Sequence, residues 1–203
     1  MARFILVRHG QTGWNREERF RGRVDIDLDE MGMRQAEAVA ERLAGCDATA
    51  VYSSPLKRAV STAGAIGRRL GLEVTPLESI VDMDFGEWEG RSVAEVRERE
   101  AGQFRVWALN PESFRVPGGE TLDEVRVRVA AAVDELAAEH QDDAVVLVSH
   151  RVVCKVLLCH LLGLDMSHFW QIAQDTTAVN GFLIAAGRST VTLVNDTCHL
   201  RAL

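Results

Sequence analysis

The sequence lacks an apolar run long enough to cross a membrane, which requires about 20 residues. Its N-terminal apolar stretch meets Arg3 and Arg8 too soon to form the core of a secretory signal peptide. It also lacks internal repeats and low-complexity tracts. We therefore expect no membrane partner and a cytoplasmic location.

Cysteine and lysine are both scarce. The cysteines show no metal-site spacing, and Cys154 and Cys159 lie in an apolar stretch where free cysteine is usually a small core residue. Lys57 and Lys155 are the only lysines, so arginine, which suits bidentate contacts with phosphate, carries almost all the positive charge. The net charge is −7 and no basic stretch is visible, so we expect no nucleic-acid partner.

The overall composition is that of an ordinary globular protein. Of the 203 residues, 47% are hydrophobic and 26% are charged, which excludes a disordered chain. This length is sufficient for one buried core. We expect residues 1–203 to form a single domain.

Strand-like and helix-like segments alternate along the chain. This alternation predicts a three-layer α/β/α sandwich with a mostly parallel central sheet. The polar segment 11–28 is expected to form a loop or a short helical turn. The predicted strands cover residues 4–7, 48–52, 73–75, 144–148, 179–184 and 190–194, and the predicted helices cover 29–43, 55–70, 122–136 and 152–162.

Several of these helices have recognisable start signals. Asp29 can cap the first helix, and Pro55 is expected at the first position of the second. Two capping-box patterns, in which the side chains and amides of two residues bond reciprocally, occur at 92–95 and 121–124.

Polar residues follow three of the predicted strands. Ligands of such sheets bind beyond the carboxyl ends of the strands. Arg58, in the first turn of a helix, adds a cation where the helix dipole already favours an anion. Gly10 could let the backbone approach a ligand, and Thr12 and Asn15 add short polar groups, so together these residues could surround a phosphate. The residues that follow the strands are Arg8 and His9, Ser53 and Ser54, and Ser149 and His150.

Residues 8–15 (RHGQTGWN) resemble the signature of the histidine phosphatase superfamily, which includes the cofactor-dependent phosphoglycerate mutases. Three further blocks agree in order, a GGE sequence is also typical, and the resemblance covers nearly the whole chain. It implies a phosphoglycerate mutase-like fold. The blocks are 53–59 (SSPLKRA) with Thr62-Ala63, 85–90 (FGEWEG) and 148–150 (VSH), and the GGE sequence is 118–120.

The resemblance also implies roles for individual residues. His9 would be the nucleophile that forms a phosphohistidine. Many members carry a Glu that protonates the leaving oxygen, and Asp82, four residues before Gly86, stands at that position. The phosphoryl oxygens would be bound by Arg8, Arg58 and His150, with help from Asn15 and the hydroxyl of Thr12.

These roles are physically consistent. A nucleophilic imidazole must be neutral, and neighbouring arginines disfavour its protonation. The same cations stabilise charge on the transferring oxygens, so no metal or other cofactor is expected.

The sequence departs from the family pattern at three positions. Asp82 is one methylene shorter than Glu, which leaves Asp84 and Glu87 as alternative general acids. Arg21 stands where many relatives carry Gln, and Arg151 follows the second histidine where Gly is common. If both face the pocket, they favour a substrate with additional negative charge. The candidate substrate-binding residues are Gly10, Thr12, Asn15, Arg21, Gly22 and Arg151.

The leading hypothesis is a metal-independent phosphomonoesterase acting on a small phosphorylated metabolite. The span between Gly90 and Gly118 is short, as in the phosphatase branch, and a short lid would admit water. The alternatives are a cofactor-dependent phosphoglycerate mutase, a non-catalytic protein that binds a phosphorylated ligand, and a two-histidine metal hydrolase. The identity of the phosphate ester stays open, and so does a homodimer.

Overall fold

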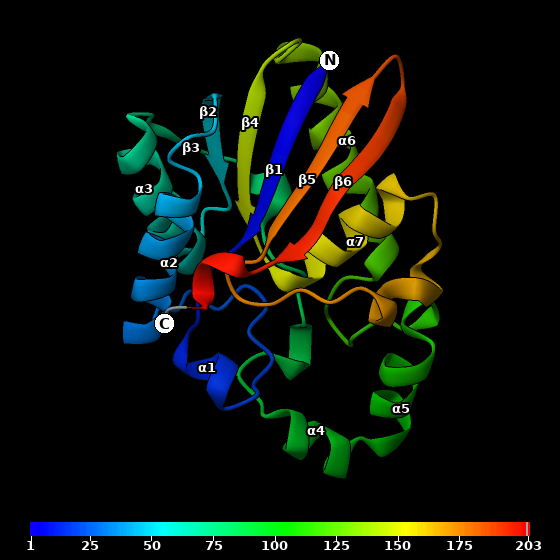
Figure 1. Ribbon diagram of the computed structural model, residues 1–203. Helices are drawn as coiled ribbons and strands as arrows, with labels where there is room; N and C mark the ends of the chain where they lie inside the picture. Colours follow the sequence, from blue (N-terminus) through cyan, green and yellow to red (C-terminus); the bar gives the residue numbers. More distant parts are fainter. Residues whose placement is uncertain (202) are drawn as a thin grey trace.

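The computed structural model describes residues 1–201 and 203. Its centre is a six-stranded sheet with the order β3-β2-β4-β1-β5-β6 (Figure 1). The first four strands in this order are parallel, β5 pairs antiparallel with β1, and β6 pairs antiparallel with β5. The predicted fold class is thereby confirmed. The strands are β1 (Ala2–Arg8), β2 (Ala48–Ser53), β3 (Val74–Pro76), β4 (Ala144–Ser149), β5 (Val179–Ala185) and β6 (Arg188–Asp196).

Helices cover both faces of the sheet, and further helices gather at one end (Figure 1). α2 (Glu30–Arg42) and α3 (Lys57–Leu70) cover one face, and α6 (Leu122–Glu139) and α7 (Arg151–Leu161) cover the other. Beyond the carboxyl ends of the parallel strands lie α1 (Gly13–Arg16), α4 (Val93–Arg99) and α5 (Ala101–Leu109). The short 3₁₀ helices are η1 (Glu78–Ile80), η2 (Gly86–Trp88), η3 (Pro111–Ser113), η4 (Met166–Gln171) and η5 (Cys198–Leu200).

Two apolar cores lie on the two faces of the sheet. One includes Leu6 and Leu157 and packs α6 and α7 against the sheet, and the other includes Val39 and Ile66 and packs α2 and α3. Because β4 is covered on both faces, all of its residues are buried, as expected for a central parallel strand. The sheet is therefore a rigid support for whatever follows its strands.

The start of α3 differs from its prediction. Pro55 precedes the helix, which begins at Lys57 after an extended Leu56. The physical reason is a contact from outside the segment, since the free amide of Lys57 donates to the Asp25 carboxylate at 2.8 Å. Asp25 thus caps the helix from the 11–28 segment, and Arg58 still lies in the first turn.

Other helix boundaries follow their predictions more closely. Asp29 accepts from the amide of Gly32 at 2.8 Å, as a cap should. The capping box at 121–124 forms in full. The one at 92–95 forms only in part, because the Glu95 carboxylate contacts Arg91 at 3.3 Å.

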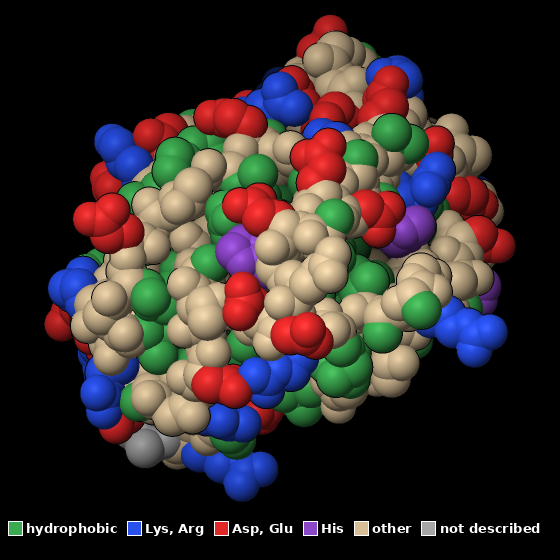
Figure 2. Space-filling view, turned by 90° about the horizontal axis from the view of Figure 1, so that it is seen from above, with side chains coloured by type: hydrophobic (Ala, Val, Ile, Leu, Met, Phe, Trp, Pro, Cys, Tyr) green, Lys and Arg blue, Asp and Glu red, His purple; other side chains and the backbone are tan. Residues whose placement is uncertain are grey.

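Figure 2 views the molecule from above the orientation of Figure 1, at the end opposite α4 and α5. Basic side chains on this face stand between acidic ones, so their charges offset one another locally. Among the helices in the described part of the chain, none is long and apolar enough to span a bilayer.

Candidate active site

Two histidine side chains meet where β1 and β4 end. Arg8 pairs with Ser149 in the parallel register, which places the next residues, His9 and His150, side by side. Their ring centroids are 5.2 Å apart, and both side chains are fully buried. The predicted meeting of the two rings is therefore present in the structure.

The His9 ring is arranged to act as a nucleophile. Its Nδ1 lies 2.7 Å from the carbonyl oxygen of Gly10. A carbonyl only accepts hydrogen bonds, so Nδ1 carries the proton and the lone pair lies on Nε2. Burial, followed by the charges of Arg58 and Arg8, lowers the pKa of His9 well below its usual value. The ring is thus neutral at physiological pH, and its reactive nitrogen faces away from the backbone anchor.

Ser54 and Asp82 lie next to the two ring nitrogens of His150. Its Nε2 lies 2.6 Å from the Ser54 hydroxyl, and its Nδ1 lies 3.6 Å from the Asp82 carboxylate. Burial lowers the pKa of His150 well below its usual value, and Arg58 and His9 add to this. With Ser54 donating to Nε2, a neutral His150 carries its proton on Nδ1, on the side of Asp82.

Arg8 and Arg58 complete a buried cluster with the two histidines. Arg8 donates to the carbonyl oxygen of Gln174 at 2.6 Å. Arg58 is fully buried and donates to the carbonyl oxygen of Gly22 at 2.7 Å and to the Asp82 carboxylate at 3.1 Å. The other terminal nitrogen of Arg58 donates to the carbonyl oxygen of Val24 at 2.8 Å, and the Nε atoms of Arg8 and Arg58 stay unpaired. We call Arg8, His9, Arg58 and His150 the buried cluster.

The buried cluster has more donors and cations than the described residues can satisfy. Buried polar groups in proteins almost always have hydrogen-bond partners, so several unpaired nitrogens in one place indicate a site for an anion with several oxygens. Burial, then the charges of Arg21 and Arg151, lower the pKa of Arg8 to about 9. An anionic ligand would offset this crowding of cations. The unpaired donors of the buried cluster are Arg8 Nε, Arg58 Nε and His150 Nδ1; Arg21 Nε and the lone-pair atom His9 Nε2 are also without a partner among the described residues.

Asp82 is better placed than its alternatives to act as an acid. It is 4% exposed and lines the cavity above the buried cluster. The carboxylate of Asp84 accepts from the amide of Gly86 at 2.8 Å, and Glu87 is exposed; neither lines that cavity. The geometry thus favours Asp82.

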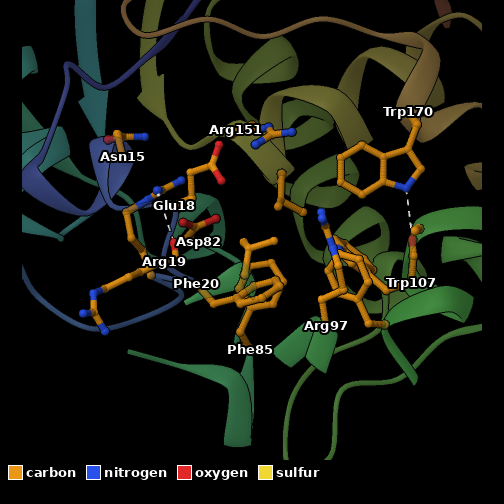
Figure 3. A pocket seen from close by; sticks show the side chains of 15 residues that line it. Asn15, Glu18, Arg19, Phe20, Asp82, Phe85, Arg97, Trp107, Arg151 and Trp170 are labelled. Atoms are coloured by element: carbon orange, nitrogen blue, oxygen red, sulfur yellow. Dashed lines mark hydrogen bonds between the residues drawn. The ribbon is translucent and has the colours of Figure 1, made fainter. Parts of the chain in front are cut away.

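The cavity outside the buried cluster has a volume of about 500 Å³. Figure 3 shows Asn15, Glu18, Asp82 and Arg151 on one side, with aromatic side chains on the other. Arg21 lines the same cavity, so both arginines that depart from the family pattern face it. We call this space the outer cavity.

Trp170 packs against the rings of Trp107 and Phe169 and also borders the outer cavity. Its side chain lines the outer cavity and is 37% exposed. Its indole nitrogen donates to the carbonyl oxygen of Trp107 at 3.0 Å, which holds the ring at the cavity edge (Figure 3). Trp88, by contrast, is fully buried in the core.

The close approach of helix α2 leaves no room for a side chain at Gly10. A Cβ at this position would lie 2.6 Å from the carbonyl oxygen of Gly32, and the Gly10 amide donates to the Thr62 hydroxyl at 3.1 Å. The close approach predicted for a ligand is therefore made to neighbouring protein. A direct contact of Gly10 with substrate stays a prediction.

Gly22 supports the buried cluster from the loop before α2. Its φ is +50°, and a Cβ would lie 1.8 Å from the carboxylate of Glu89. Its carbonyl oxygen accepts from Arg58, as described above. Gly22 thus positions Arg58, and its contact with substrate stays a prediction.

Thr12 and Asn15 bond to each other. The Thr12 hydroxyl donates to the Asn15 side-chain oxygen at 2.9 Å, and the Thr12 amide donates to the same atom. These bonds orient Asn15, which lines the outer cavity, at the start of α1. The predicted role of Thr12 in phosphate binding stays a prediction.

Comparison with known proteins places this site in a family. The family model of the histidine phosphatase superfamily (branch 1) matches residues 4–197. The chain belongs to this superfamily. It is 38% identical to phosphoserine phosphatase 1 of Hydrogenobacter thermophilus over 98% of this chain and 95% of that protein.

Solved structures give the same assignment. YhfR of Bacillus stearothermophilus is 27% identical and superposes with a TM-score of 0.95 over 99% of this chain and 100% of that one. A mutant phosphoserine phosphatase of Entamoeba histolytica, solved in complex with phosphoserine, is 28% identical with a TM-score of 0.89, over 98% of this chain and 100% of that one. The histidine phosphatase fold is thus shared along almost the whole chain.

Some supporting residues of this histidine phosphatase were missed from the sequence. The carbonyl oxygen of Gln174 binds Arg8 although the two residues are 166 positions apart, and no local sequence pattern predicts this contact. Ser54 was placed at a strand end but given no role, although its position beside the second-histidine strand was a usable signal. Arg97 of α4 also lines the outer cavity and carried no signal.

Proposed function

We propose that this histidine phosphatase is a metal-independent phosphomonoesterase that hydrolyses a small phosphorylated metabolite through a phosphohistidine on His9. The observation that carries this proposal is the neutral His9 ring, with its proton anchored on Gly10 and its Nε2 unpaired among arginine and histidine donors. That arrangement suits attack on a phosphorus whose oxygens need several donors.

The first half-reaction would transfer the phosphoryl group to the protein. The lone pair on His9 Nε2 attacks phosphorus, and the bond from phosphorus to the leaving oxygen breaks. Asp82 gives its proton to that oxygen. Arg8, Arg58 and the Nδ1 proton of His150 bind the three remaining phosphoryl oxygens, which carry the negative charge.

The second half-reaction would return His9 to its starting form. A water molecule attacks phosphorus and loses a proton to the Asp82 carboxylate while the bond from phosphorus to Nε2 breaks. Inorganic phosphate leaves, and His9 is again neutral with its lone pair on Nε2. The same carboxyl group therefore acts first as an acid and then as a base.

The test is a phosphate-release screen over phosphorylated metabolites, run with wild type and His9→Ala in parallel. We expect release that chelators do not affect, that vanadate inhibits and that His9→Ala abolishes. Turnover surviving in His9→Ala would remove the mechanism, and loss of wild-type activity on chelation would favour the metal hydrolase.

The same screen addresses the remaining alternatives. Isomerisation of 3-phosphoglycerate in the presence of 2,3-bisphosphoglycerate, faster than phosphate release, would favour the mutase. Binding of phosphate esters without any turnover would favour the non-catalytic protein. The cytoplasmic location, the single domain over residues 1–203 and a homodimer stay predictions.

A further inference from the structure

Two arginines outside the buried cluster face the outer cavity while lying on aromatic rings. Arg97 of α4 lies 5.1 Å from the ring centroid of Phe104, and Arg151, the first residue of α7, lies 5.5 Å from that of Trp170. Both arginines line the outer cavity, so two guanidinium groups from distant parts of the sequence share one space.

The positive charges of Arg97 and Arg151 are not neutralised. Neither forms an ion pair with any residue that the structure describes, whereas Arg91 pairs with Glu95 and Glu100, and Arg99 pairs with Glu95. An aromatic face attracts and orients a guanidinium group without adding a negative charge. The donor edges of Arg97 and Arg151 thus stay available to an anion.

The surroundings of Arg97 and Arg151 also favour the binding of an anion. Arg151 stands at the N-terminus of an eleven-residue helix, where the helix dipole is positive, and the N-cap residue His150 makes no side-chain cap bond. The carboxylates that line the outer cavity are Glu18 and Asp82. Asp82 contacts Arg58 and His150, and neither carboxylate forms an ion pair with Arg97 or Arg151.

Apolar side chains lie between Arg97 and the reaction centre, whereas Arg151 lies on the side of Asp82. Figure 3 shows Phe20 and Phe85 between Asp82 on one side and Arg97 on the other. The cavity volume of about 500 Å³ lies in the range of pockets that enclose a whole small molecule rather than a phosphate group alone. A ligand that reached from Asp82 to Arg97 would thus lie along aromatic side chains.

We propose that Arg97 and Arg151 form a second anion subsite, which binds an acidic group at the far end of the leaving group. The substrate class is a phosphate monoester whose leaving group has an apolar body and ends in a carboxylate or a second phosphate. This inference rests on the proposed function, because the phosphate to be hydrolysed must occupy the buried cluster.

The test compares two esters that differ only at the far end, 4-(carboxymethyl)phenyl phosphate and 4-(2-hydroxyethyl)phenyl phosphate. Their bodies are the same, and the methylene next to the ring keeps the acidities of the two phenols similar. A charge-assisted contact contributes enough for a preference of at least about tenfold in kcat/KM for the acid. We expect this preference to appear as a lower KM.

Arg97→Gln and Arg151→Gln should each remove most of that preference by raising the KM of the acid about tenfold, with the neutral ester little changed. The matched control is Arg99→Gln, two residues further along α4, whose side chain is exposed and does not line the cavity. It should keep the full preference. Circular dichroism of each variant checks that the fold is retained.

A second readout separates this inference from the proposed function. In a His9→Ala background, calorimetry measures binding of both esters without turnover, and the acid should bind at least about tenfold more tightly. Equal binding of the two esters, or an equal loss in Arg99→Gln, would overturn the subsite even if wild type releases phosphate. Conversely, preferential binding without phosphate release from either ester would support the subsite and count against the proposed reaction.

Discussion

The buried cluster and the outer cavity lie next to each other but are built in different ways. Arg8, His9, Arg58 and His150 are at most 6% exposed, and backbone carbonyl oxygens or buried side chains anchor them. In the outer cavity, Arg97 and Arg151 are exposed and lie on aromatic rings. The first arrangement depends on the sheet, whereas the second can change without disturbing it.

This difference separates the residues proposed to carry out the reaction from those proposed to select the leaving group. Under the proposed function the buried cluster binds the phosphoryl group, which all phosphate monoesters share, so changes in its geometry should affect kcat for every substrate. Under the same proposal Arg97 and Arg151 of the outer cavity contact only the leaving group. Changes there should alter KM in a way that depends on the leaving group.

The largest effect is expected from Asp82→Asn, which removes the proposed acid at the boundary between the two regions. Asn keeps the shape of Asp but cannot deliver the proton, so kcat should fall roughly 10²–10⁴-fold for alkyl phosphates. The loss should be much smaller for 4-nitrophenyl phosphate, whose leaving group needs no proton.

The matched control for Asp82→Asn is Asp84→Asn. Asp84 bonds the amide of Gly86, and an Asn side-chain oxygen can accept the same bond. Steady-state kinetics on both esters should show nearly wild-type turnover for this control. Asp82 would lose its assigned role if Asp84→Asn were the inactive variant and Asp82→Asn the active one.

A smaller effect is expected from Trp170→Leu, which removes the ring beneath Arg151. Cation–π contacts contribute about 0.5–2 kcal/mol, so the KM of an acid-ended ester should rise roughly 2- to 30-fold. Trp170→Phe keeps an aromatic face and should restore most of the affinity. A fall in kcat that is equal for all esters would instead place Trp170 in the support of the buried cluster.

The smallest effect concerns Lys155, which lies beneath Trp170 between the two regions. Its amino group lies 4.8 Å from the ring centroid of Phe169 and 4.7 Å from that of Trp170. Burial, then the charges of Arg151 and Arg8, lower the pKa of Lys155 to about 7. The folded state therefore binds this proton less tightly than the unfolded state, whose lysine pKa is about 10.4.

The lowered pKa of Lys155 determines the direction in which the stability of the fold changes with pH. Below pH 7 the charged Lys155 lowers the free energy of unfolding by its full amount, and this reduction becomes smaller as the pH rises toward about 10.4. Lys155→Met removes it, so the variant should gain roughly 2–4 °C in Tm per kcal/mol relieved at pH 6. Thermal melts at pH 6 and pH 10 measure the effect. A gain at pH 10 as large as that at pH 6 would show that charge is not its cause.

The order of strands and helices could be read from the sequence because it depends on local patterns. The apolar run at 144–148 indicates a buried strand, and the alternation of strand-like and helix-like segments predicts a parallel sheet. The carboxyl ends of neighbouring parallel strands lie at the same edge, so His9 and His150 could be expected to meet. Family motifs then predicted the roles that the geometry supports.

Contacts between distant segments could not be read in the same way. The start of α3 was misplaced because Asp25, 32 residues from Lys57, supplies the cap. The position of Trp170 at the cavity could not be read either, because the sequence does not tell which side of an aromatic ring faces solvent. Arg97 has no distinctive neighbours along the chain, and only the packing of α4 brings it to the cavity.

The sequence by itself determined the sheet, its helices and the identity of the reacting side chains, because hydrophobic periodicity and short motifs act over a few residues. Only the tertiary structure decided which nitrogen of His9 is free, which carbonyl oxygens hold the arginines and which charges line the outer cavity. These properties depend on burial and on atoms far apart in the chain, and both arise only when the segments pack together.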